Sequence, residues 1–318
     1  MNQTSPASAA VKAPPLPSPS TAGLAARGLA AAIGAFVIWG LFPLFLKGLS
    51  TVPSLQIIAH RILWSCLFLL AWMGLRGELA QLREAALRKG VLLRLAGTAL
   101  LISANWIAFV WAINNDHVLD VSLGYYINPL FNVLLGVFVL SERLNRAQWA
   151  AVGVAAVGVA YLALFSGHVP WVALVVGVSF ALYGLVRKTV SVDALPGLTI
   201  ETLLLVPFAG GFLFWCESQG VAAFAHSTTF VDVLLVLSGV VTAIPLFLFA
   251  YGARQIPYST IGVLQFIAPS LQLASGVLVF NEPFGHDRAV GFLFIWVALG
   301  IYAGHGLWQA RTRKLATA

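Results

Sequence analysis

The sequence predicts an all-α integral membrane protein of ten transmembrane helices, built as two inverted five-helix repeats with both termini in the cytoplasm. Three observations predict this fold: an apolar composition, apolar runs of spanning length, and basic residues in every second connection. Apolar residues make up 60% of the 318 residues and charged residues only 9%. Soluble domains contain about 45–50% apolar and about 25% charged residues, so this chain falls outside their range.

The apolar segments are each close to the roughly 20 residues with which a helix spans a bilayer. They lie at residues 28–46, 54–75, 91–113, 118–140, 147–165, 169–188, 197–216, 232–252, 258–280 and 287–308. None alternates as a barrel strand would, and a backbone in lipid must satisfy its own polar groups, so helices are predicted. Residues 1–26, rich in Ala, Pro and Ser, are predicted to form a disordered cytoplasmic tail, and residues 311–318 a basic cytoplasmic tail.

The distribution of Lys and Arg predicts the orientation. With ten spans and a cytoplasmic N-terminus, 15 of the 18 Lys and Arg residues fall in inside segments. The outside loops carry only Lys47 and Arg288, and Arg61 lies within the second span. This split follows the positive-inside rule. The net charge of +7 is therefore interpreted as membrane topology, and membrane lipid rather than nucleic acid is the expected partner.

The two halves of the sequence resemble each other, and we expect one repeat at residues 27–165 and the other at 166–310. A shift of 140 residues superposes the fourth span on the ninth. It pairs Ile127 with Ile267, Pro129 with Pro269, Gly136 with Gly276, Val137 with Val277, Val139 with Val279 and Glu142 with Glu282. Because each repeat holds an odd number of spans, the second copy enters the membrane from the opposite side. Inverted repeats of this kind are typical of secondary transporters.

Several sequence patterns that would indicate other functions are absent. The chain has no Gly-x-x-x-x-Gly-Lys-Ser/Thr phosphate loop, no His-Glu-x-x-His and no Gly-x-Ser-x-Gly. Cys66 and Cys216 both lie in apolar runs, which predicts buried small side chains rather than a disulfide or metal ligands. No enzyme activity, no cofactor and no metal are expected.

Short motifs dispersed in order over roughly residues 28–308 resemble the RarD-type permeases of the EamA family, in the drug/metabolite transporter superfamily. They are Ala59-His60-Arg61, Asn105-Trp106, Trp111-Ala112-Ile113-Asn114-Asn115, Ser122-Leu123-Gly124-Tyr125-Tyr126-Ile127-Asn128-Pro129-Leu130, Ser141-Glu142-Arg143-Leu144, Tyr183-Gly184-Leu185-Val186-Arg187-Lys188, Ile200-Glu201-Thr202 and Phe294-Ile295-Trp296-Val297-Ala298-Leu299. The resemblance implies a transporter of the inner (plasma) membrane and supplies no substrate.

Two prolines near the centres of the fourth and ninth spans predict the position of a solute site. Pro129 and Pro269 each remove a backbone donor and free the carbonyl four residues earlier, at Tyr125 and Gln265. Freed carbonyls at mid-membrane need protein or a water-filled cavity to receive them. A packing kink is the alternative. We predict a cavity between the halves, with Asn128 and aromatic neighbours facing it. Candidate neighbours are Trp106, Trp111, Tyr125 and Tyr126.

The second span carries two further candidates. Arg61 has three open interpretations: snorkelling to the outer headgroups, a salt bridge to Asp120, or an anion anchor facing the cavity. His60 lies about 100° away around the helix and forms a stripe with Gln56 and Trp64. This stripe is expected either to face the cavity or to form hydrogen bonds between helices.

Glu201 is the one acidic residue well inside an apolar run of the second half. Desolvation favours the neutral form of a carboxyl, which suits a proton carrier. An ordinary acidic residue near a helix N-terminus is the alternative. Together these observations predict a secondary transporter that moves a small organic metabolite or drug-like solute by alternating access. An intramembrane enzyme and a membrane scaffold or regulator are the competing functions.

Overall fold

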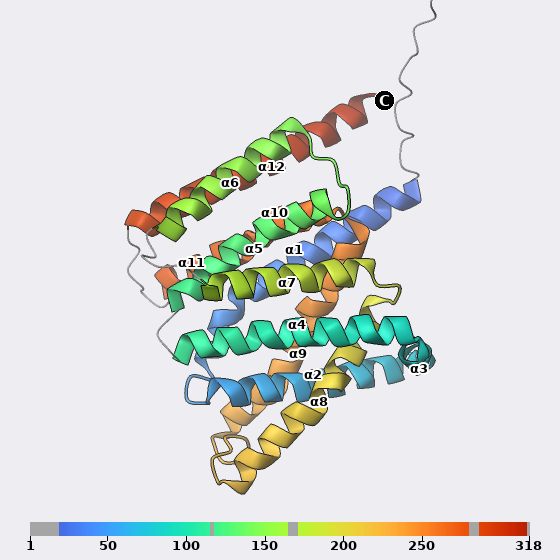
Figure 1. Cartoon of the computed structure of the whole chain (residues 1–318), viewed down its shortest axis with the longest axis vertical. Coiled ribbons are helices and arrows are strands. Elements are labelled where there is room, and N and C mark those ends of the chain that lie inside the picture. The colour runs from blue at the N-terminus through green and yellow to red at the C-terminus, as the bar shows by residue number, and fades with distance from the viewer. Residues whose placement is uncertain (1–18, 115–117, 165–170, 280–285, 317–318) are drawn as a thin grey trace, which may run out of the picture.

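The computed structural model describes residues 19–114, 118–164, 171–279 and 286–316. Every regular element assigned in these ranges is a helix, as Figure 1 shows. The helices are α1 (Pro19–Lys47), α2 (Ser54–Leu75), α3 (Leu79–Leu87), α4 (Lys89–Asn114), α5 (Val118–Phe138), α6 (Arg146–Leu164), α7 (Trp171–Thr189), α8 (Ala194–Ser218), α9 (Thr229–Gln255), α10 (Tyr258–Gln265), α11 (Ile267–Val279) and α12 (His286–Ala316).

Eight segments within the described residues are long and apolar enough to cross a membrane. They comprise α1, α2, α4, α6, α7, α8, α9 and the α10–α11 pair taken together. The helices α5 and α12 contain the shorter apolar stretches Leu123–Phe138 and Ala289–His305. The chain is therefore a multi-pass integral membrane protein, and each of the predicted apolar runs falls on one of these helices.

Two elements differ from the prediction. The short helix α3 lies in the segment between the second and third predicted spans, where the sequence predicts only a basic connection. The ninth predicted span is divided, because α10 ends at Gln265 and α11 begins at Ile267. Ser270 Oγ donates to the Phe266 carbonyl oxygen at 2.8 Å, so a side chain satisfies a carbonyl at this break.

The spanning helices lie side by side in one bundle (Figure 1). The pair α6 and α12 forms one end of its long axis, α2 and α8 lie toward the other end, and α1, α5, α7 and α10 lie between. Within this bundle α5 packs on α7, and α10 and α11 pack on α1. Likewise α1 packs on α9, and α4 packs on α7.

Small residues and caps set these contacts. A Cβ added at Gly239 in α9 would lie 2.4 Å from the carbonyl carbon of Trp64, so glycine permits the close approach of α2 and α9. The start of α6 is closed by a reciprocal capping box. Gln148 N donates to Asn145 Oδ1 and Asn145 N donates to Gln148 Oε1, both at 2.9 Å. Cys66 and Cys216 are free and buried, which confirms their prediction as buried small side chains.

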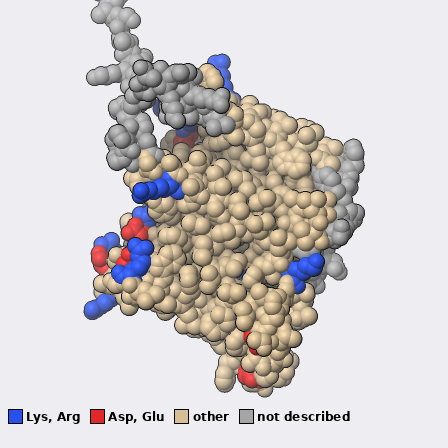
Figure 2. All heavy atoms as spheres, turned by 180° about the vertical axis from the view of Figure 1, so that it is seen from behind, with Lys and Arg blue, Asp and Glu red and all other residues tan. Residues whose placement is uncertain are grey.

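The first turns of α1 and the last turns of α12 lie at the same side of the bundle (Figure 1). Figure 2, which views the bundle from behind, shows most of the visible Lys and Arg side chains gathered at that side. The largest hydrophobic cluster, which includes Phe36, Tyr183, Phe249 and Tyr258, joins helices from both halves of the chain.

Candidate functional site

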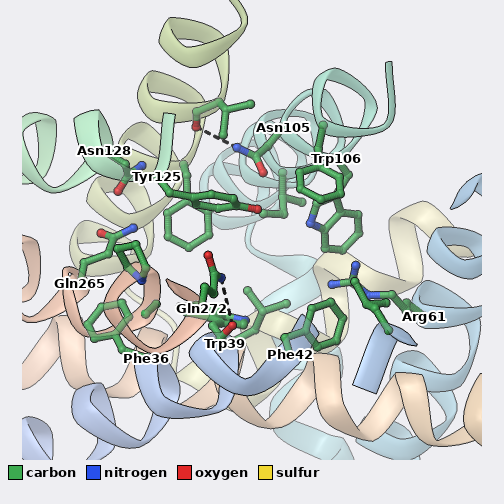
Figure 3. Close-up of a pocket in the computed structure, with 18 residues that line it drawn as sticks. Phe36, Trp39, Phe42, Arg61, Asn105, Trp106, Tyr125, Asn128, Gln265 and Gln272 are labelled. Carbon is green, nitrogen blue, oxygen red and sulfur yellow. Dashed lines mark hydrogen bonds between the residues drawn. The ribbon is translucent and has the colours of Figure 1, made fainter. Parts of the chain in front are cut away.

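A cavity of about 130 Å³ lies between helices of both halves of the chain (Figure 3). Its walls come from α1, α2, α4 and α5 of the first half and from α7, α9, α10 and α11 of the second half. The lining residues are Phe36, Trp39, Phe42, Leu46, Arg61, Ile102, Asn105, Trp106, Phe109, Tyr125, Asn128, Val176, Phe180, Leu246, Gln265, Ala268, Pro269 and Gln272.

Seven of the eighteen lining residues are aromatic, and several of their rings contact one another. Trp39 meets Phe180 edge to face, with ring centroids 5.6 Å apart and an interplanar angle of 81°. Phe109 and Tyr125 form a second such pair at 6.4 Å. Edge-to-face pairs of this kind are favourable beyond the area that they bury, so the rings hold fixed positions. The result is a set of flat apolar surfaces with a few polar groups between them.

Arg61 projects from α2 to one side of the cavity (Figure 3). Its Nε donates to Thr242 Oγ1 at 2.8 Å. Its guanidinium carbon lies 4.9 Å from the centroid of the Phe42 ring and 5.2 Å from that of the Trp106 ring, within the range of cation–π attraction. Three interpretations of Arg61 were open. The position of its side chain at the cavity agrees with the one in which Arg61 faces the cavity. The side chain of Asp120, the predicted salt-bridge partner, lies outside the described residues.

Buried amides occupy the opposite side of the cavity, where α5, α7 and α10 meet (Figure 3). Asn128 Nδ2 donates to the Gly177 carbonyl oxygen at 2.7 Å, and Asn132 Nδ2 donates to Gln265 Oε1 at 2.5 Å. Asn132 Nδ2 also lies 3.2 Å from Asn128 Oδ1. These bonds fix Asn128 and Gln265 beside the cavity and tie the break after α10 to α5.

Five of the residues predicted for the solute site line this cavity together: Trp106, Tyr125, Asn128, Gln265 and Pro269. Pro129 does not. It is buried beside a small apolar crevice with Ala151, Ala155 and Phe266, and α5 continues through it without interruption. The two prolines are therefore not structurally equivalent. Pro129 packs within an unbroken helix, and Pro269 follows the break between α10 and α11.

His60 is also displaced from the predicted site. It does not line the cavity; its ring lies 5.3 Å from the Phe224 ring, and Trp64 contacts the same ring at 5.9 Å. Gln56 Nε2 donates to the Val221 carbonyl oxygen at 2.7 Å, and Ala223 N donates to Gln56 Oε1 at 2.8 Å. The stripe of Gln56, His60 and Trp64 thus packs against the connection between α8 and α9.

Glu201 is buried and does not line the cavity; it belongs to a polar cluster that the sequence did not predict. Its Oε1 lies 3.5 Å from Arg187 Nη1 and accepts a hydrogen bond from Thr98 Oγ1. Its Oε2 accepts from Tyr183 Oη at 3.3 Å. Arg187 is only 1% exposed, and its Nη2 donates to the Ala194 carbonyl oxygen at 2.8 Å.

The cluster joins α4, α7 and α8, and glycine makes room for it. A Cβ at Gly197 would lie 2.1 Å from Arg187 Nη1. In the sequence, Arg187 lies in one motif of the family resemblance and among the basic residues of the predicted inside segments. Arg187 and Glu201 meet because α7 and α8 both pack on α4, which no local sequence pattern encodes.

Comparison with known proteins places the chain in a family. Residues 26–164 match the EamA-like transporter family. The chain is 44% identical over 281 residues to an uncharacterized transporter of Pseudomonas aeruginosa, covering 87% of this chain and 93% of the relative. It is 38% identical over 289 residues to the protein RarD of Escherichia coli, covering 91% of this chain and 98% of the relative.

The chain belongs to the EamA-like transporter family, and within it to the RarD-type permeases. It is a secondary transporter of the bacterial inner membrane. A solved crystal structure of a protein 19% identical in sequence superposes with a TM-score of 0.66, covering 88% of this chain and 96% of that one, and shows that the two share a fold.

Proposed function

We propose that this transporter moves a small organic solute by alternating access, and that the central cavity is its solute site. One observation carries the proposal: helices of both halves of the chain line a single cavity with aromatic walls and a few convergent polar groups. Concave, mostly apolar sites with a few placed polar groups are typical of small-molecule sites. A packed scaffold has no need of such a cavity. Among the described lining residues only Arg61 and Tyr125 carry ionisable groups, which offers no acid–base pair for an intramembrane enzyme.

We further propose ten transmembrane helices in two inverted repeats, residues 27–165 and 166–310. The packing of the helices supports this proposal. Exchanging each helix for its counterpart converts the α5–α7 contact into that of α10 and α11 with α1, and the α1–α9 contact into that of α7 with α4. The pairs α2–α8, α5–α10 and α6–α12 each join a helix to its own counterpart. Such symmetry lets the two halves exchange roles, as alternating access requires.

In this topology both termini are cytoplasmic, and the cavity belongs to the outer part of the bundle. Phe42 lies late in the outgoing α1, and Arg61 lies early in the returning α2. The cluster containing Tyr183, Phe249 and Tyr258 fills the cytoplasmic side of the cavity. We therefore propose that this conformation is closed toward the cytoplasm.

Reporter fusions test the topology. A reporter fused after Lys314 is expected to have cytoplasmic activity, because basic segments stay inside. The same reporter inserted in the connection between α8 and α9, within residues 217–231, is expected to have external activity. An external C-terminus would contradict both the ten-helix topology and the inverted repeat.

Cysteine accessibility tests the cavity as the solute site. Gln272→Cys and Gln265→Cys, in a background with Cys66 and Cys216 replaced by alanine, are expected to react with small hydrophilic thiol reagents because both positions line the cavity. A transported solute should slow both reactions. Leu278→Cys, at a side chain 79% exposed on the apolar surface of the bundle, is the control and should react slowly in lipid at a rate that solute does not change. Unreactive cysteines at both cavity positions in an active protein would place the solute site elsewhere.

Glu201 remains our candidate for proton coupling. Its support is the full burial of a carboxyl among the side chains of three helices, where any change in its charge would alter their packing. Arg61 and Asp120 were the other candidate charge partners; Arg61 is assigned to the solute below.

A further inference from the structure

The charge of the cavity lining is concentrated at one side, and this indicates the charge of the solute. Arg61 is the one lining residue, among those that the structure describes, with a side chain that is charged at neutral pH. The other polar side chains of the lining are neutral at pH 7 and include the amides of Asn105, Asn128, Gln265 and Gln272 and the hydroxyl of Tyr125. The cavity therefore presents one positive charge at one side and hydrogen-bonding amides elsewhere (Figure 3).

Within the part of the chain that the structure describes, the partners of Arg61 include no anion. They are the Thr242 hydroxyl, the faces of Phe42 and Trp106, and the nearby phenol of Tyr125, which is neutral at pH 7. A charge held away from bulk water is costly unless an opposite charge accompanies it. The guanidinium of arginine presents a planar fork of donors that matches a carboxylate with two hydrogen bonds. A ligand that brings a carboxylate into the cavity supplies what the described residues do not.

The rest of the wall defines the body of such a ligand. Trp39, Trp106, Phe109 and Phe180 present rings that suit a flat apolar group. An apolar cavity of about 150 Å³ in another protein holds one benzene molecule, and the volume here is about 130 Å³. Gln272 Nε2 donates to the Trp39 carbonyl oxygen at 3.2 Å, and its own carbonyl oxygen points into the cavity (Figure 3).

We propose that the solute is an organic monoanion: a carboxylate on a flat apolar body of about one ring, with the carboxylate bound by Arg61 and the body between the aromatic walls. This inference rests on the proposed function, since it takes the cavity as the solute site. It excludes organic cations as the preferred solutes, because a cation would add a second positive charge beside Arg61.

A set of matched probes tests the charge preference. Benzoate, benzamide and benzylammonium share one ring and differ in charge, and phenylacetate with its amide varies the spacing. Binding to the purified full-length protein is measured by thermal shift and by protection of Gln272→Cys from thiol reagents. We expect benzoate or phenylacetate to bind at least about tenfold more tightly than its amide, because an arginine–carboxylate pair away from water outweighs a neutral hydrogen bond.

Three variants separate the role of Arg61 from general damage. Arg61→Gln should weaken carboxylate binding by about 10- to 100-fold and leave amide binding within about twofold. Arg61→Lys keeps the charge without the fork and should be intermediate. Arg83→Gln, the same change at an exposed position on α3, should have no effect.

The outcomes distinguish the two levels of inference. If amides or benzylammonium bind as tightly as the carboxylates and protect Gln272→Cys, or if Arg61→Gln binds carboxylates like the wild type, the anion inference is wrong and the cavity remains the solute site. If no probe protects the cavity cysteines and a solute that the protein transports does not protect them either, the proposed function of the cavity fails as well. Selective carboxylate binding that Arg61→Gln removes supports both.

Discussion

Replacing Glu201 by glutamine is expected to lower the free energy of unfolding by about 3–5 kcal/mol, because it leaves Arg187 buried without a counter-charge. Arg187 is 1% exposed and Glu201 is 2% exposed, so water cannot replace the lost partner. The Ala194 carbonyl oxygen, at 2.8 Å from Nη2, is neutral and compensates only in part. Thermal unfolding in detergent, or the rate of proteolysis of the folded protein, measures the effect.

The double variant Arg187→Met with Glu201→Gln is the matched control. It removes both charges, and the one amide oxygen of the glutamine can still accept from Thr98 or Tyr183, which donate to different oxygens of Glu201. Replacing a buried ion pair by uncharged groups is often neutral or stabilising, so most of the lost stability should return. If the single and double variants are equally unstable, the unpaired charge of Arg187 is not the cause of the lost stability. The hydrogen bonds from Thr98 and Tyr183 to Glu201 would then be its cause.

The double variant also separates structure from coupling. If Glu201 carries the coupled proton, this variant should fold and equilibrate solute down its gradient, but it should fail to accumulate solute against one. Flux into vesicles with and without an imposed pH gradient measures both. A folded double variant that accumulates solute like the wild type would restrict Glu201 to a structural role.

The spans could be predicted from the sequence because the bilayer imposes a simple constraint. Each apolar run must be a helix of limited length, and basic residues predict which ends of the helices are cytoplasmic. The helix α3 was missed because nine residues between two spans give too short a pattern to separate from a polar connection. Pro269 predicts a disrupted hydrogen bond one turn earlier, but it does not predict that the helix divides in two at Phe266.

The sequence predicts how far along each helix the site residues lie. It predicts less well which side of the helix they face. In a soluble helix the apolar face points inward, but lipid and protein interior are both apolar, so composition does not tell which face of α2 meets the bundle. Arg61 and His60 are adjacent in sequence, yet Arg61 faces the cavity and His60 faces Phe224. The same ambiguity explains Pro129, whose neighbour Asn128 lines the cavity while the proline itself packs away from it.

The aromatic wall shows a related limit. Phe36, Trp39, Phe42 and Phe180 line the cavity, although their sequence context resembles that of rings elsewhere in these spans. Their role depends on the way in which α1 and α7 meet across the two halves, which is a long-range property. Polar residues within apolar runs are a usable signal, because burying them in a membrane costs free energy. Arg61, Asn128 and Gln265 are such residues, and each lies at the cavity.

Replacing Glu142 by alanine is expected to lower the free energy of unfolding by about 2–4 kcal/mol, because this carboxylate caps the N-terminus of α10 from outside the helix. It accepts hydrogen bonds from Tyr258 N at 2.6 Å and from Ser259 N at 2.8 Å. Glu84→Ala is the matched control, since Glu84 is exposed and pairs with Arg88 on the same helix turn, a contact worth at most about 0.5 kcal/mol.

In the proposed topology the same contact should also hold the cytoplasmic side of the bundle closed, because Glu142 follows α5 of the first half and α10 belongs to the second half. Ile261 is fully buried in the folded protein. We therefore expect Ile261→Cys to react with hydrophilic reagents from the cytoplasmic side when it is combined with Glu142→Ala, and to stay unreactive when it is combined with Glu84→Ala. Inside-out vesicles, with Cys66 and Cys216 replaced by alanine, give the measurement. A Glu142→Ala variant that loses stability but leaves this cysteine protected would make Glu142 a helix cap alone, and the closure would then depend on the apolar packing of Tyr258 and its neighbours.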